Sequence, residues 1–166
     1  MASLGITDDV ADQFRKLVIA HELSHFWFGC NYQGKDGWML EGIPQYLGMF
    51  AVQKESKEKV AALIAFTEYL DKQIPQDAIP NSPFGQSKVL NIRSYYQGSL
   101  ALFRIGENIG HENLIKLLTS VYRKNPNPTF ADFNNDFKNS YPDHIDFWRK
   151  AWRLEEKESN KSFERK

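Results

Sequence analysis

The residue types best suited to chemistry lie in the run His21-Glu22-Leu23-Ser24-His25. On a helix, positions four apart lie nearly above one another, so His21 and His25 would present two imidazoles to one point, which is half of a tetrahedral zinc site. Glu22 would be rotated by roughly 100° from His21, where it can reach a water on the metal and act as its general base. The alternative is a pair of helix histidines beside a solvated Glu, because so short a pattern also arises by chance.

A third metal ligand is expected from Glu41, which follows a short connection after the second histidine. A catalytic zinc site uses three protein ligands and keeps one position open for water. Two imidazoles and one carboxylate leave a net positive site, which polarises a carbonyl and acidifies water. Glu41 also suits the first turn of a helix, where the helix dipole favours a carboxylate, and both roles can hold together. We therefore predict one Zn²⁺ per chain, bound by His21, His25 and Glu41.

Helices must position these residues, and the sequence is dominated by helical patterns. Apolar residues recur every three to four positions across 7–29, which predicts one amphipathic helix containing both histidines. A loop over 30–37 follows, and a helix is predicted to begin near Glu41 with Pro44 in its first turn. Further helical patterns cover 56–73, 96–109, 113–124, a stretch from 129 and a stretch from 142.

The rest of the chain completes a helical fold. Thr129 and Asp132 form a variant capping box, Pro142 is predicted to start the last helix, and a break is predicted at Gly110. The Pro-rich stretch 74–91 reads as a long loop. We find no convincing strand alternation. The predicted fold is mainly α, with about seven helices and little or no sheet, in one catalytic subdomain over 1–154 followed by a charged tail over 155–166.

Composition limits the classes of partner. Lys plus Arg (21) balances Asp plus Glu (21), which gives no reason to expect nucleic acid or an anionic membrane surface. No run approaches the roughly eighteen apolar residues of a membrane span, and the N-terminus lacks the regions of a signal peptide. The single cysteine, Cys30, cannot form an internal disulfide. A soluble chain is therefore predicted; the compartment is open, with the cytoplasm favoured.

A family resemblance is carried by Val18-Ile-Ala-His-Glu-Leu-Ser-His-Phe-Trp-Phe-Gly29 and by Trp38-Met-Leu-Glu-Gly-Ile-Pro-Gln-Tyr46. Together they resemble the zinc signature of the aminopeptidase N family of gluzincins, whose catalytic domain is thermolysin-like. The segment Tyr95-Tyr96-Gln97-Gly98 is similar to that family's Tyr-x-x-Gly segment. The resemblance implies zinc-dependent hydrolysis of peptide substrates, of aminopeptidase type, with Tyr95 stabilising the oxyanion. Tyr96 is the competing candidate for that role.

Three departures from the family bear on this reading. Fifteen residues, 26–40, separate His25 from Glu41, fewer than is usual in the family, and Leu40 stands where Asn is common. The Gly-x-Met-Glu-Asn strand that binds the substrate's amino group in the family is not found before the zinc helix. Nothing in the sequence reads as the sheet lobe that lines the family's cleft. We therefore expect either a helical portion of a longer protein, whose further domains would be partners, or a minimal relative with an open cleft.

Two alternatives to an aminopeptidase stay open. An endopeptidase of the same zinc chemistry is the first, because the anchor for the amino group is not seen. A non-catalytic zinc-binding interaction module is the second. Glu22 favours an enzyme, because a purely structural zinc site needs ligands but has no use for a base beside them.

Other conspicuous residues are assigned mainly to structure. His111 and His144 lack ligand spacing and are predicted to be surface or cap residues. Cys30 lies close enough to the zinc helix to be a ligand, but packing is its favoured role. The aromatic residues Phe26, Trp27, Phe28, Trp148 and Trp152 are predicted to lie mostly in the core, with the last two as an alternative docking face for further domains.

Overall fold

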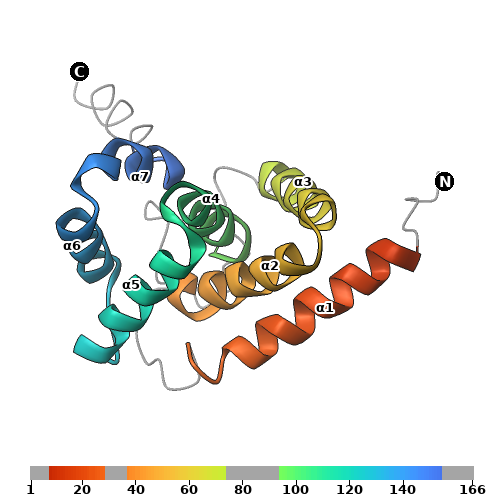
Figure 1. Cartoon of the computed structure of the whole chain (residues 1–166), viewed down its shortest axis with the longest axis horizontal. Helices are drawn as coiled ribbons and strands as arrows, with labels where there is room; N and C mark the ends of the chain where they lie inside the picture. Colours follow the sequence, from red (N-terminus) through yellow and green to blue (C-terminus); the bar gives the residue numbers. More distant parts are fainter. Residues whose placement is uncertain (1–7, 29–36, 74–93, 155–166) are drawn as a thin grey trace. The chain divides into compact units, whose positions relative to one another are not determined.

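The structure is a computed structural model that describes residues 8–28, 37–73 and 94–154. Contacts divide the chain into two compact units, residues 1–100 (unit 1) and 101–166 (unit 2). Seven α-helices and no strand occur in the described ranges, which confirms the predicted mainly α fold (Figure 1). The predicted loop over 30–37 except its last residue, the predicted loop over 74–91 and the predicted tail over 155–166 lie outside the described residues.

Unit 1 is built around a central helix, α2 (Ile43–Glu55), which lies alongside α1 (Asp8–Ser24) and contacts α3 (Lys57–Gln73) (Figure 1). A π-helical turn, η1 (Trp38–Gly42), leads into α2, and a second, η3 (Ser94–Gly98), packs against η1. Pro44 lies in the first turn of α2, as predicted. The core consists of fully buried apolar side chains, mainly from η1 and α2: Trp38, Met39, Ile43, Tyr46, Met49 and Val52.

The helix predicted over 7–29 is shorter in the structure. It ends at Ser24, and residues 25–28 form a turn in which the amides of His25, Phe26 and Trp27 donate to the carbonyls three residues earlier. Such three-residue bonds tighten the last turn of a helix and satisfy carbonyls that have no partner further along the chain. His25 therefore lies just beyond the helix, although it stays one turn from His21.

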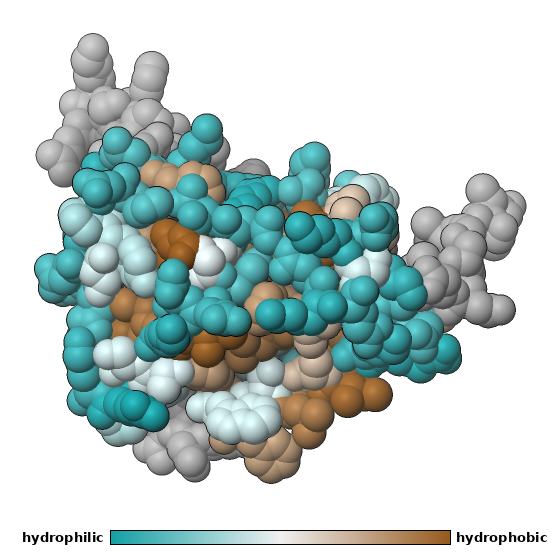
Figure 2. All heavy atoms as spheres, viewed as in Figure 1, coloured by the Kyte–Doolittle hydropathy of each residue, from teal (hydrophilic) through white to brown (hydrophobic). Residues whose placement is uncertain are grey.

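The turn also corrects a prediction about the core. Phe26 and Trp27 were expected to be buried, but 76% and 73% of their surfaces are exposed, and within this trio only Phe28 is buried. Figure 2 shows apolar side chains gathered on the surface over the C-terminal half of α1, where Ile19 and Leu23 are also exposed. The tight turn after Ser24 rotates the two aromatic rings away from the buried face of α1. No helix of the described ranges has the length and apolar character needed to cross a membrane.

The helices α1 and α2 approach closely at Gly48. A Cβ atom at this position would lie 2.8 Å from the backbone oxygen of Leu17 and 3.5 Å from the backbone nitrogen of His21. Glycine therefore sets the distance between the helix that carries His21 and the helix that packs against it.

We expect Gly48→Ala to destabilise the chain by about 1–3 kcal/mol, because the added methyl group meets main chain that cannot rotate away. In an unhindered helix interior the same change would stabilise by roughly 0.5–1 kcal/mol. Urea unfolding of Gly48→Ala beside Ala51→Gly, at an exposed position of the same helix, separates the steric effect from helix propensity. An increase in stability for Gly48→Ala would contradict the close approach.

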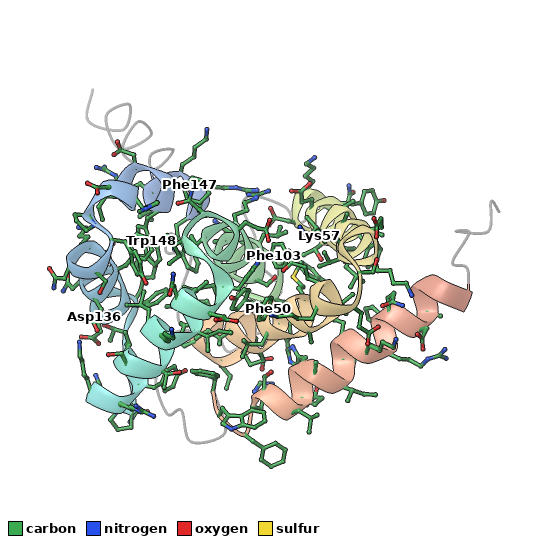
Figure 3. The ribbon with its side chains drawn as sticks, viewed as in Figure 1. Phe50, Lys57, Phe103, Asp136, Phe147 and Trp148 are labelled. Carbon is green, nitrogen blue, oxygen red and sulfur yellow. The ribbon has the colours of Figure 1, made fainter. Side chains whose placement is uncertain are left out.

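Unit 2 contains α4 (Ser99–Ile109, of which the first two residues belong to unit 1), α5 (His111–Lys124), α6 (Phe130–Ser140), the 3₁₀ turn η4 (Pro142–His144) and α7 (Ile145–Ala151). The predicted break at Gly110 is confirmed, and this residue has φ of +92°, a conformation that favours glycine. Trp148 points from α7 toward α6 (Figure 3) and stacks on Phe137 with ring centres 4.2 Å apart. Trp148 and Trp152 are both buried, as predicted.

Both hydrogen bonds of the predicted capping box are present at the start of α6. The backbone amide of Asp132 donates to the Thr129 hydroxyl over 3.3 Å, and the backbone amide of Thr129 donates to the Asp132 carboxylate over 2.8 Å. Hydrogen bonds from the backbone and side chain of Thr129 lower the pKa of Asp132 below its ordinary value. The bonds that the Asp132 carboxylate accepts from Thr129 thus favour its ionised form.

We expect Thr129→Ala to lower the free energy of unfolding by about 1 kcal/mol at neutral pH. Because the folded pKa of Asp132 is depressed, its contribution is present above the unfolded value near 3.8 and is lost as the pH falls through the folded pKa. The stability difference between the unaltered chain and Thr129→Ala should therefore shrink in acid. Urea unfolding at several pH values measures it, with Thr129→Ser as the conservative control; a difference independent of pH would contradict this account.

Candidate metal centre

The two histidines bring their imidazole nitrogens together at the C-terminal end of α1. The Nε2 atoms of His21 and His25 lie 3.1 Å apart, and the two rings meet edge to face. His21 is buried, whereas His25 is partly exposed. Two nitrogens that face each other at this distance repel when both present lone pairs, so the arrangement is stabilised by a cation or a proton between them.

Glu41 reaches the same point from η1. Its Oε2 atom lies 3.4 Å from His21 Nε2 and 3.7 Å from His25 Nε2. This oxygen is buried and has no hydrogen-bond partner. Burial by itself raises the pKa of the Glu41 carboxyl, but the neighbouring His21 and Tyr95 side chains and the charge on His25 lower it more, so the net pKa falls below its ordinary value. A buried carboxylate oxygen without a donor is suited to a metal ion.

The three predicted ligands therefore lie together. One ligand atom from each of His21, His25 and Glu41 lies within 4.8 Å of the other two, and no other group of this kind occurs among the described residues. Two imidazoles and a carboxylate match the ligand set of catalytic zinc sites. Glu41 is held near the histidines by η1, which packs against η3.

Packing of η1 against η3 depends on a second close approach. A Cβ atom at Gly98 would lie 3.3 Å from Trp38 Cβ and 3.6 Å from Gly42 Cα. The Ser99 hydroxyl donates a hydrogen bond to the Tyr95 carbonyl, so this carbonyl oxygen has a partner where the π-helix changes to an α-helix. These contacts place Tyr95 beside the turn that carries Glu41.

Glu22 and Tyr95 line a cavity that His21 also borders. Glu22 is exposed and lines a cavity together with His21, Tyr95 and Tyr96. The Tyr95 ring stacks on His21 with ring centres 5.7 Å apart. Burial, followed by the hydrogen bond and negative charge of Glu41 and the charge of Glu22, raises the pKa of the Tyr95 phenol, which keeps its proton at neutral pH. Tyr96 lies on the same cavity, but these interactions with Glu41 favour Tyr95 as the hydrogen-bond donor.

No protein-family model and no solved structure match this chain significantly. The resemblance to the aminopeptidase N family therefore stays a prediction from the motifs, and the geometry of unit 1 must be judged by its own chemistry.

A residue that sequence reasoning missed completes the site. His21 Nδ1 lies 3.0 Å from Gln45 Oε1, which is an acceptor, so Nδ1 is the donor in this hydrogen bond and Nε2 is the ring nitrogen available to a metal. Histidine ligands in metal sites usually donate their second ring nitrogen to an acceptor of this kind. Gln45 follows Glu41 by four residues, or one helical turn, and this spacing could have predicted that the two side chains lie on one face of the helix.

The other two histidines, His111 and His144, contact residues outside this cluster. His111 Nε2 pairs with Glu107 at 2.8 Å, and His144 Nδ1 lies 2.6 Å from Asn108 Oδ1. Neither histidine belongs to a group of possible metal ligands among the described residues. Cys30 lies outside the described residues.

Proposed function

We propose that this chain binds one zinc ion through His21, His25 and Glu41 and hydrolyses peptide bonds. One observation carries the proposal: one ligand atom from each of these residues lies within 4.8 Å of the other two, and a carboxylate that is not needed as a ligand lines a cavity together with His21. That carboxylate is Glu22. When bound, zinc would supply the Lewis acidity that polarises the peptide carbonyl and acidifies water.

The protein side chains have separate tasks in this reaction. Glu22 accepts a proton from water as the water oxygen bonds to the carbonyl carbon, and returns it to the amide nitrogen as the C–N bond breaks. The products are one carboxylate and one protonated amine, which takes up both protons of the water. The Tyr95 hydroxyl, held in its protonated form, donates a hydrogen bond to the carbonyl oxygen as negative charge develops there. Gln45 orients His21 through Nδ1.

The aminopeptidase type rests on the motif resemblance. An endopeptidase is the rival within the same chemistry, and a zinc-binding module without turnover is the rival outside it. Zinc content of the purified chain, measured by plasma mass spectrometry, and hydrolysis of free and N-acetylated peptides separate the three. We expect about one zinc per chain and cleavage that requires a free N-terminus. Cleavage of acetylated peptides would favour the endopeptidase, and zinc without cleavage would favour the module.

Gln45 offers a test of the metal geometry that does not depend on turnover. We expect Gln45→Ala to weaken zinc binding by about 10–100-fold, because an outer partner fixes the tautomer and orientation of a ligand histidine. Competition with a chelating dye measures the affinity. Gln53→Ala, on the same helix but not among the residues that border the cluster, is the matched control. Equal affinity for zinc in Gln45→Ala and the unaltered chain would contradict the assigned role.

A further inference from the structure

The outer face of α1 lies opposite the face that packs on the rest of unit 1. The buried residues of α1 recur at intervals of three to four and define the face that packs against α2 and α3: Gln13, Leu17, His21 and Ser24. Ile19 and Leu23 lie one helical turn apart on the other side of the helix. They are 60% and 50% exposed. The outer face of α1 is therefore apolar near its C-terminal end.

Phe26 and Trp27 extend this apolar surface into the turn that follows Ser24 (Figure 2). We call these four residues, Ile19, Leu23, Phe26 and Trp27, the α1 patch. The two aromatic rings alone leave on the order of 300 Å² open, because an aromatic side chain offers roughly 150–250 Å². With Ile19 and Leu23 added, the patch lies within the roughly 300–600 Å² that is typical of the largest apolar patch on a monomer, and such patches often mark an interaction site.

Two cationic side chains lie one helical turn before the α1 patch on the same outer side of α1. The Arg15 side chain is 69% exposed, and its guanidinium lies 3.9 Å from Asp12, at the limit of an ion pair. The Lys16 side chain is 40% exposed and pairs with Glu55 over 2.7 Å. The outer face thus carries cations at one end and aromatic rings at the other, and cations are attracted to the faces of aromatic rings.

This arrangement is complementary to itself when a second copy of α1 lies antiparallel on the first. In an antiparallel pair, each step forward along one helix is matched by a step back along the other. With Ile19 opposite Leu23 of the second copy, Arg15 lies opposite Trp27 and Lys16 lies opposite Phe26 of that copy. A two-fold axis repeats every one of these pairs, as a symmetric dimer requires.

We propose that the α1 patch is a dimer interface, at which two copies of this chain pair antiparallel through α1. The two patches together bury about 1,000 Å², which is near the lower limit of a specific protein interface, so the dimer should be weak and reversible. A second copy supplies both the apolar surface and the matching cations. The balanced charge of the chain gives no attraction to an anionic membrane, which is the other surface that could cover such a patch.

The test is sedimentation velocity of the full-length chain over a range from about 1 μM to about 500 μM, because dimer formation follows mass action. We expect the average mass to rise from that of one chain toward that of two. Ile19→Lys and Leu23→Glu each place an unpaired charge in the central pair, so each should weaken self-association by at least about tenfold.

The double variant Ile19→Lys/Leu23→Glu tests the antiparallel register. In this register each introduced lysine faces an introduced glutamate of the second copy, so the double variant should associate more tightly than either single variant. In a parallel pair, like charges would face each other instead. Weaker association of the double variant than of both single variants would overturn the proposed pairing.

Tyr69→Lys is the matched control, because it introduces the same charge at an exposed aromatic residue of α3, away from the α1 patch. Its self-association should equal that of the unaltered chain, and circular dichroism checks that the helices persist in every variant. A chain that stays monomeric over the whole range would overturn the proposal. In that case, binding to phosphatidylcholine vesicles that is lost in Leu23→Glu would assign the α1 patch to a membrane surface.

Discussion

Glu22→Gln is expected to lower the rate of peptide hydrolysis by about 10²–10⁴-fold, the usual contribution of a general acid and base. Glutamine keeps the size of the side chain but cannot accept the proton of the attacking water. Glu22 is exposed and is not a member of the ligand cluster, so zinc content should stay near that of the unaltered chain. The measurement is turnover of a free peptide at matched zinc occupancy.

The variant Tyr95→Phe tests the role of the hydrogen-bond donor independently of the general base, Glu22. It removes one hydroxyl while keeping the ring that stacks on His21, and loss of a single oxyanion donor typically costs about 10²–10³-fold in turnover. Tyr96→Phe should keep its activity if Tyr95 is the donor. Full activity in Glu22→Gln would show that Glu22 is not the general base of the reaction.

Glu41→Gln is expected to lose most of its zinc affinity. Removing an outer partner of a metal ligand already costs about 10–100-fold, and Glu41 supplies a ligand directly, so the loss should exceed this range. The remaining His21 and His25 would hold a metal with two nitrogens alone. Zinc content after dialysis, and affinity by dye competition, measure the effect.

Glu22→Gln is the matched control for this second prediction, because it removes a carboxylate of the same kind from the residue that follows His21 in the chain. The two variants should show opposite behaviour: one keeps zinc and loses turnover, and the other loses zinc. Retention of full zinc affinity in Glu41→Gln would mean that the carboxylate beside the histidines is not a ligand. Circular dichroism of both variants checks that the helices persist.

Local patterns in the sequence were sufficient for most of the helices. The break at Gly110 and the capping box of Thr129 and Asp132 depend on bonds between neighbours in the chain, and the structure contains them as predicted. Pro142 was predicted to start the last helix, but it begins the 3₁₀ turn η4, and α7 follows from Ile145. The π-helical turns η1 and η3 were not predicted, since periodicity near 3.6 residues does not distinguish them from α-helix. Both turns carry site residues, Glu41 and Tyr95.

The sequence by itself determined that His21 and His25 would face one point, because a single helical turn joins them. It also placed Glu22 beside them and identified Glu41 as the carboxylate for the same site. Only the tertiary structure decided that Gln45 supports His21, that Phe26 and Trp27 face solvent, and that an apolar cavity adjoins Glu22. The exposure of Phe26 and Trp27 follows from the tight turn after Ser24, whereas the other two features arise where separate elements meet. Spacing along one helix fixes which side chains share a face, but the distance between helices is set by close approaches such as Gly48 against Leu17, which no local pattern encodes.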